Sequence, residues 1–166
     1  MRTLGLLILL AAWPLCGDAQ PPQSDATPSS RQQGVGQRGD HVMGFSHDAT
    51  AHHFRLLKDG GEIMVIANDA NDKSTIDAIQ MHLGHIATMF SEGNFQAPML
   101  IHDTNPPGVA SMIRLKSQIR YEVSNVDRGA KIRIVSTAPD AIDAVHAFLL
   151  FQIIDHHTGD PATIGN

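Results

Sequence analysis

The chain has 166 residues and a formal net charge of −5, and its sequence contains no block of basic residues. This charge balance argues against a nucleic-acid partner, because nucleic-acid-binding domains present clustered lysine and arginine. The length is enough for one domain and a tail, and no apolar run after the N-terminus is long enough to cross a membrane.

The first residues have the pattern of a secretory signal peptide. The chain starts with Met1-Arg2, continues through an apolar run at residues 4–12, and has small residues before a cleavage point after Ala19. Such segments are removed from the mature protein. We therefore assign residues 1–19 to a signal peptide and expect a periplasmic or secreted protein.

Cys16 is the only cysteine, and it raises the alternative of a lipid anchor. Leu15 precedes it where lipoprotein processing requires a small residue, so the anchor is not favoured. Cleavage after Ala19 leaves a mature chain without cysteine, which excludes disulfides, thiolate metal ligands and a cysteine nucleophile. A metal site would then consist of histidine, methionine, aspartate or glutamate.

Residues 20–40 are rich in proline, glutamine, serine and glycine, and Val35 is the one branched aliphatic residue among them. A segment of this composition cannot bury enough apolar surface to order itself. We predict that residues 20–40 form a disordered linker and that residues 41–166 form a single domain.

The domain begins with a predicted β-hairpin, whose strands at residues 51–58 and 62–67 flank an Asp-Gly-Gly turn. Residues 74–92 then form the clearest amphipathic helix of the chain, with Ser74 or Thr75 as its N-cap. Its apolar stripe recurs at three- and four-residue spacing. The stripe comprises Ile76, Ile79, Leu83, Ile86 and Phe90.

The second half repeats this pattern after a predicted loop at residues 95–105 and a short helix at 109–117. A second hairpin pairs residues 119–126 with 130–137 across an Asp-Arg-Gly turn, and a last helix covers 139–156. The sequence thus predicts a ββα unit used twice. The expected fold is an α+β two-layer sandwich, in which helices cover one face of a four-stranded antiparallel sheet.

Ten histidines distinguish the composition, and all of them follow residue 40. Histidine serves metal binding, acid–base chemistry and pH sensing, whereas surface polar groups and hydrogen-bonded core groups are the alternative interpretation. His82 and His85 are three residues apart on the helix at 74–92, so both can reach one metal ion. We weigh ligation and a solvated helix edge equally for this pair.

Three further histidines extend the predicted metal site. His53 belongs to a His52-His53 pair in the first strand, where alternation directs one side chain inward and one outward. His102 follows in the loop at 95–105, and His146 lies beside the apolar stripe of the last helix. Histidine with methionine would suit copper, and histidine with carboxylate would suit zinc.

Two other functions stay open at this level. Haem bound without covalent attachment is a variant of the metal hypothesis, because histidine and methionine are haem ligands and the sequence lacks a Cys-x-x-Cys-His motif. A small-molecule-binding or enzymatic domain with a histidine as acid or base is the main alternative. No nucleophile or phosphate-loop motif is present, so catalytic residues are not assigned.

Five short motifs carry a resemblance to a known family, at residues 43–46, 50–54, 82–87, 98–102 and 151–160. Across roughly residues 43–161 the chain resembles a family of small exported bacterial proteins, whose members often carry the label aspartate carbamoyltransferase. The resemblance implies a bacterial envelope protein, without an established activity or catalytic residue. The Ser-Thr-Arg-Thr motif with which aspartate carbamoyltransferases bind phosphate is absent from the sequence.

Overall fold

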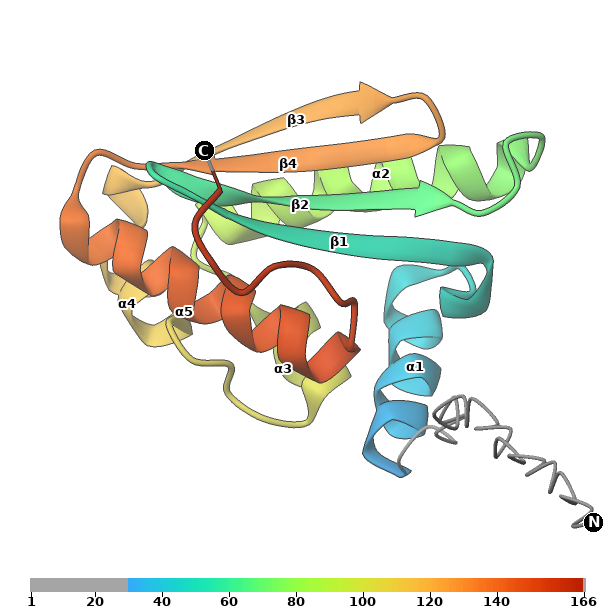
Figure 1. Ribbon diagram of the computed structural model, residues 1–166, viewed down its shortest axis with the longest axis horizontal. Coiled ribbons are helices and arrows are strands. Elements are labelled where there is room, and N and C mark those ends of the chain that lie inside the picture. Colours follow the sequence, from blue (N-terminus) through green and yellow to red (C-terminus); the bar gives the residue numbers. More distant parts are fainter. Residues whose placement is uncertain (1–29, 166) are drawn as a thin grey trace, which may run out of the picture.

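The structure, a computed structural model, describes residues 30–165 (Figure 1). The predicted signal peptide and the predicted linker up to residue 29 lie outside the described residues. In chain order the elements are α1 (Ser30–Met43), the short 3-10 turn η1 (His47–Ala49), β1 (Thr50–Leu57), β2 (Gly60–Ala67), α2 (Lys73–Ser91), α3 (Gln96–His102), α4 (Val109–Arg114), the 3-10 turn η2 (Lys116–Gln118), β3 (Arg120–Val126), β4 (Gly129–Val135) and α5 (Pro139–His156).

The four strands form one antiparallel sheet in the order β1-β2-β4-β3, which confirms the predicted α+β fold. The two hairpins meet at β2 and β4, where the backbones approach closely at two glycines. A Cβ atom at Gly60 would collide with the carbonyl oxygen of Ile134, and one at Gly129 with the carbonyl oxygen of Val65. Glycine is therefore required at both positions for the hairpins to join.

Each long helix packs mainly against the hairpin that it does not follow in sequence. α2 follows β1 and β2 but covers chiefly β3 and β4, whereas α5 follows β3 and β4 and covers β1 and β2. The two helices therefore lie over different halves of one sheet face, with α3 and α4 closing the same layer (Figure 1). A pocket remains between α2 and α5, and it is described below.

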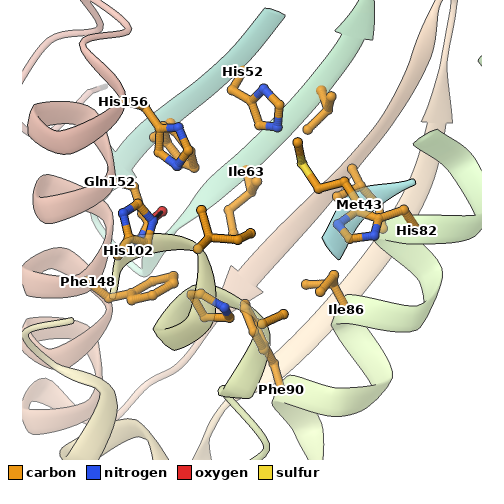
Figure 2. A pocket seen from close by; sticks show the side chains of 16 residues that line it. Met43, His52, Ile63, His82, Ile86, Phe90, His102, Phe148, Gln152 and His156 are labelled. Carbon is orange, nitrogen blue, oxygen red and sulfur yellow. Dashed lines mark hydrogen bonds between the residues drawn. The ribbon is translucent and has the colours of Figure 1, made fainter. Parts of the chain in front are cut away.

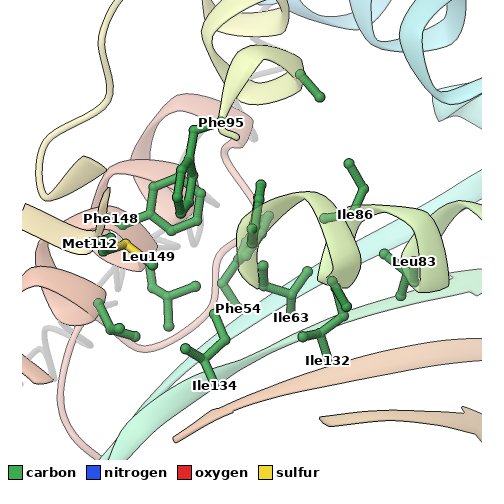
Figure 3. Packing of buried hydrophobic residues seen from close by; sticks show 14 of the residues in the cluster. Phe54, Ile63, Leu83, Ile86, Phe95, Met112, Ile132, Ile134, Phe148 and Leu149 are labelled. Carbon is green, nitrogen blue, oxygen red and sulfur yellow. The ribbon is translucent and has the colours of Figure 1, made fainter. Parts of the chain in front are cut away.

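The core is formed by the inward-facing side chains of the strands and the apolar stripes of α2 and α5 (Figure 3). Phe90 of α2 stacks on Phe95 with ring centroids 4.3 Å apart, and Phe148 of α5 meets Phe95 edge-on at 5.9 Å. All three rings are buried. Such aromatic pairs contribute about 0.5–1.5 kcal/mol each beyond their area burial, and they fix α2 against α5.

Helix α1 corrects the predicted linker. Residues 30–40, expected to be disordered, belong to α1, and Val35 in the middle of the helix is only 3 % exposed. The prediction was therefore wrong for this part of the linker. The composition of residues 20–40 is typical of disorder in an isolated segment, but α1 is held by contacts with distant parts of the chain.

Two arginines make these long-range contacts. The Nε atom of Arg38 donates to the carbonyl oxygen of Ile101 over 2.8 Å. Arg31 pairs with Asp155 of α5 over 2.7 Å. These two contacts tie helix α1 to α3 and α5, against which it packs.

Two local predictions also need correction. Most of the region expected to be a loop at residues 95–105 is the helix α3, which begins at Gln96 and ends where Asp103 adopts a left-handed conformation with φ 49°. The N-cap of α2 is Asp72, whose side chain accepts a hydrogen bond from the backbone N–H of Thr75. The other predicted helices and strands begin and end within three residues of their predicted bounds.

The chain after α5 returns along the outer edge of β1. The carboxylate of Asp160 accepts a hydrogen bond from the backbone N–H of Phe54 over 2.9 Å, and Gly165 forms a parallel bridge with Leu57. The tail thus covers part of an edge strand, which would otherwise expose unpaired backbone groups. None of the helices between residues 30 and 165 combines the length and apolarity needed to span a membrane.

Candidate functional site

A cavity of about 70 Å³ lies between α2, α3 and α5 above β1 and β2, and we call it the inner chamber (Figure 2). Its wall is mainly apolar and includes Phe54, Ile63, Ile86 and Phe148. Met43, at the end of α1, extends across one side. The polar side chains that reach this wall are His52, His82, His102, Gln152 and His156.

A second and larger cavity of about 290 Å³ lies beside α1, and we call it the outer chamber. It shares Met43, His52 and His156 with the inner chamber, so these three side chains stand between the two spaces. The α1 side of the outer chamber includes Gly36, where a Cβ atom would lie 2.6 Å from the ring of His47. Glycine at this position therefore lets α1 approach η1.

His52 and His156 form a parallel pair at the boundary of the chambers. Their ring centroids are 5.6 Å apart and their planes differ by 4°. Burial, followed by the charges of nearby histidines, lowers the pKa of His52 to about 4 and that of His156 to about 3. Both imidazoles are therefore neutral near pH 7.

His82 lies on the opposite wall, on α2. Burial, followed by the charge of His85, lowers the pKa of His82 to about 4, and its ring meets Phe45 edge-on at 5.6 Å. Figure 2 shows the thioether of Met43 between His52 and His82. Two neutral imidazoles and a soft sulfur atom thus face one side of the inner chamber.

A chain of hydrogen bonds leads from α1 into the inner chamber. Nε of Arg31 donates to Oδ1 of Asp155 over 2.7 Å, and Oδ2 of Asp155 lies 2.6 Å from Nδ1 of His102. Nε2 of His102 lies 2.9 Å from Oε1 of Gln152. Arg31, Asp155, His102 and Gln152 therefore form a continuous relay, which ends at the pocket wall.

The relay ends in an unpaired polar atom. Gln152 is 4 % exposed, and its Nε2 atom has no hydrogen-bond partner among the described residues. A buried donor without a partner costs about 1–3 kcal/mol, so such groups in native proteins require an explanation. Because Gln152 lines the inner chamber, a hydrogen-bond acceptor inside the chamber would satisfy this amide.

The structure distributes the five predicted metal ligands over different places. His82 and His102 line the inner chamber, whereas His85 is exposed on α2. His53 lies 3.2 Å from Asp160 on the other side of β1, and Nε2 of His146 donates to the carbonyl oxygen of Leu57 over 2.8 Å. The five do not meet at one point.

Within residues 30–165 no group of three or more histidine, cysteine, aspartate or glutamate residues is arranged to hold a metal ion. The copper or zinc site therefore stays a prediction. Sequence reasoning missed His52, His156, Gln152 and Met43 as wall residues. A signal for His52 was available, because His52, Phe54 and Leu56 share one strand face, and the two apolar residues have to face the core.

No family model, curated protein or solved structure matches the chain.

The chemistry of the site therefore has to be argued from its own geometry. The inner chamber offers three neutral imidazoles, one thioether and one unpaired amide in a mainly apolar wall. His102 is not available as a general base, because both of its ring nitrogens are engaged. The arrangement is suited to holding a ligand rather than to transferring a proton.

Proposed function

We propose that this domain binds a small uncharged organic molecule, with a hydrogen-bond acceptor in the inner chamber and its remaining part in the outer chamber. The observation that carries the proposal is the unpaired amide of Gln152 in a mainly apolar wall. Binding pockets are typically apolar with a few convergent polar groups that set orientation, and Gln152 provides such a group.

The volumes of the two chambers limit the size of the ligand. The inner chamber, at about 70 Å³, has room for a few heavy atoms, and the outer chamber offers about 290 Å³. Pockets for drug-sized ligands are about 300–1,000 Å³. A compact molecule that places a carbonyl, ether or ring nitrogen against Nε2 of Gln152 fits both spaces.

Neutral histidines favour binding over acid–base catalysis. A general base works best when its pKa is near the ambient pH, whereas the pKa of His52 is about 4 and that of His156 about 3. Neither accepts a proton readily near pH 7. The same rings present apolar faces and weak hydrogen-bonding edges, which suit an uncharged ligand.

A soft metal ion is the second candidate, favoured by the thioether of Met43 between His52 and His82 (Figure 2). Metal ligation requires neutral imidazole, and both histidines are neutral near pH 7 because burial lowers their pKa. Methionine with histidine suits copper in its reduced state better than zinc. An exported location, which stays a prediction, would be compatible with either ligand.

One experiment separates the two candidates. The untagged mature protein is purified without chelators, analysed for metal, and titrated with reduced copper and with a library of compact ketones, ethers and azoles. Compounds that raise the melting temperature of the wild type, but not of Gln152→Leu, would support the organic ligand. Stoichiometric copper that is lost in Met43→Leu and retained in Gln152→Leu would replace the proposal with the metal site.

A further inference from the structure

Three side chains separate the inner chamber from the outer chamber, because Met43, His52 and His156 line both cavities. We call the passage between these three side chains the constriction. A ligand that reaches Nε2 of Gln152 from the outer chamber has to pass through it. The width of the constriction therefore limits the shape of any ligand that occupies both chambers.

One side of the constriction consists of rings that hold one another in place. His52 and His156 stack with ring centroids 5.6 Å apart. The ring of Phe54 packs against both, with centroids 6.5 Å from His52 and 5.6 Å from His156, and His102 meets His156 edge-on at 4.8 Å. Because Phe54 and His102 are buried in a closely packed interior, the two histidine rings cannot move apart without disturbing it.

The other side of the constriction is a single methionine. Met43, the last residue of α1, is partly buried and places its thioether between His52 and His82 (Figure 2). Its terminal methyl group lies beside Gly39, where a Cβ atom would be 3.2 Å from Cε of Met43. The absence of a side chain at Gly39 therefore gives this methyl group room against α1. Because methionine is unbranched and adapts to what it contacts, Met43 is the residue of the constriction that can yield to a ligand.

We infer that Met43 determines the ligand specificity of this pocket, because it admits ligands that are unbranched at the constriction and rejects ligands that are branched there. The inference rests on the proposed function, since it defines the ligand class of the same pocket. The ligand has a hydrogen-bond acceptor for Gln152 at one end and an unbranched aliphatic link beside Met43. The remaining part of the ligand lies in the outer chamber.

The volumes of the chambers support selection by width. At about 70 Å³, the inner chamber has no room for a bulky group in addition to the acceptor, so the bulk of the ligand stays in the outer chamber of about 290 Å³. The link between the two ends then lies against the thioether of Met43 and the ring faces of His52 and His156. A methylene buried against such apolar surfaces raises affinity about fourfold, whereas a branch that does not fit lowers it about tenfold or more.

The test uses two isomeric ketones that share the carbonyl acceptor and differ in the shape of the alkyl chain. The chain of n-pentyl methyl ketone is unbranched, whereas that of neopentyl methyl ketone has a quaternary carbon one methylene from the carbonyl group. Ligand-observed NMR measures both dissociation constants with the untagged mature protein, in the presence of a chelator that removes metal ions. We expect the wild type to bind the n-pentyl isomer about tenfold more tightly than the neopentyl isomer.

The variant Met43→Ala should abolish this preference. It removes the thioether and leaves space at the constriction, so the affinities of the two isomers should agree within about twofold. The matched control is Met81→Ala, because Met81 is 73 % exposed on α2 and lines neither chamber, and it should keep the preference of the wild type. Gln152→Leu should weaken the binding of both isomers and leave their ratio unchanged, since the isomers share the carbonyl group.

The variant Gly39→Ala tests the constriction without removing a side chain. The added methyl group takes the space that Cε of Met43 uses beside α1, so Met43 can bend less far from the passage. The n-pentyl isomer should then bind about fourfold more weakly, as the loss of one buried methylene implies. Methyl ethyl ketone is short enough for the inner chamber alone and should keep its affinity. Alanine also favours a helix more than glycine does, so this variant should keep α1 folded.

The outcomes separate the inference from the proposed function. If no ketone binds the wild type, or if Gln152→Leu binds the ketones as tightly as the wild type does, the proposed function fails and the inference fails with it. If Gln152→Leu weakens both isomers but the wild type binds them equally, or Met43→Ala keeps the preference, the inference fails although the pocket stands. The wild type and Gly39→Ala give this answer even if Met43→Ala does not fold.

Discussion

Two histidine–carboxylate pairs occur in this domain, and their surroundings differ. His102 pairs with Asp155 through Nδ1 at 2.6 Å, and the ring is 1 % exposed between α3 and α5. His53 pairs with Asp160 through Nδ1 at 3.2 Å, and the ring is 35 % exposed at the edge of β1. The two pairs contain the same chemical groups but serve different purposes.

The difference lies in what the second nitrogen reaches. Nε2 of His102 continues the relay to Gln152 and the inner chamber. The pair of His53 ends at the tail, where Asp160 also accepts from the backbone N–H of Phe54. A buried histidine must satisfy both nitrogens and therefore orders its neighbours, whereas a half-exposed one can leave a nitrogen to water. Burial, rather than the ion pair itself, makes His102 part of a site.

Removal of the buried imidazole should have the largest effect on stability. His102→Ala removes the contact of the ring with Asp155 and the contact of Nε2 with Oε1 of Gln152. It also leaves a cavity where the buried ring stood. The cavity left by the buried ring and its lost hydrogen bonds together cost about 3–5 kcal/mol. Urea denaturation of the described domain measures this difference in the free energy of unfolding.

His53→Ala is the matched control for this prediction. Its ring is 35 % exposed, so the expected loss is below about 1 kcal/mol, the usual range for exposed pairs. If both variants lose the same free energy of unfolding, burial does not distinguish the two pairs, and the proposed role of His102 loses its basis.

Acid should destabilise the fold through the neutral histidines. The pKa values of His52, His82 and His156 lie at about 3–4 in the folded state, against about 6.5 in an unfolded chain. The unfolded state therefore binds more protons below pH 6.5. The stability that these groups contribute is complete above pH 6.5 and is lost as the pH falls toward 4.

The slope of this loss is testable. It approaches about 1.4 kcal/mol per pH unit for each neutral buried histidine. His156→Phe should reduce the slope between pH 6 and pH 4.5, whereas His85→Phe, on the exposed side of α2, should reduce it less. Equal slopes in wild type and His156→Phe would show that the histidines at the boundary of the chambers are not kept neutral.

Local patterns made much of the fold predictable from sequence. The apolar stripe of α2 and the start of α5 at Pro139 were predicted correctly. Apolar spacing and the position of a proline determine structure within a few residues, so the sequence alone shows them. Helix α1 was not predictable, because Arg31 and Arg38 reach partners far along the chain. Composition alone cannot reveal such contacts.

The candidate site was predictable only in part. His82 was predicted from its helical spacing to His85, and His102 as a histidine of the region at 95–105; both line the inner chamber. The carboxylate partner of His102 is Asp155 on α5, which is 53 residues further along the chain, so the local sequence could not reveal it. Gln152 carried no sequence signal at all, because only its buried and unpaired amide marks it.

Loss of the exposed pair should affect the tail more than the core. Asp160→Ala removes the acceptor of the Phe54 N–H group and the partner of His53. One such hydrogen bond contributes about 1 kcal/mol. Hydrogen exchange should become faster at Phe54 and at Gly165, which donates to Leu56, while the amides of α5 keep their protection. Faster exchange throughout α5 would contradict the separation of the two pairs.

The smallest effect on stability is expected for Arg31→Met, although Arg31 belongs to the relay of the buried pair. Its side chain is 52 % exposed, so water and salt screen its attraction to Asp155. Unfolding by urea at low and high salt should separate variant and wild type slightly at low salt and not at high salt. Because His102 still binds Asp155, the ring and Gln152 should keep their ¹⁵N shifts. If Arg31→Met destabilised the domain as much as His102→Ala, the relay would depend on its exposed end, and burial would not explain why one histidine pair forms a site and the other anchors a tail.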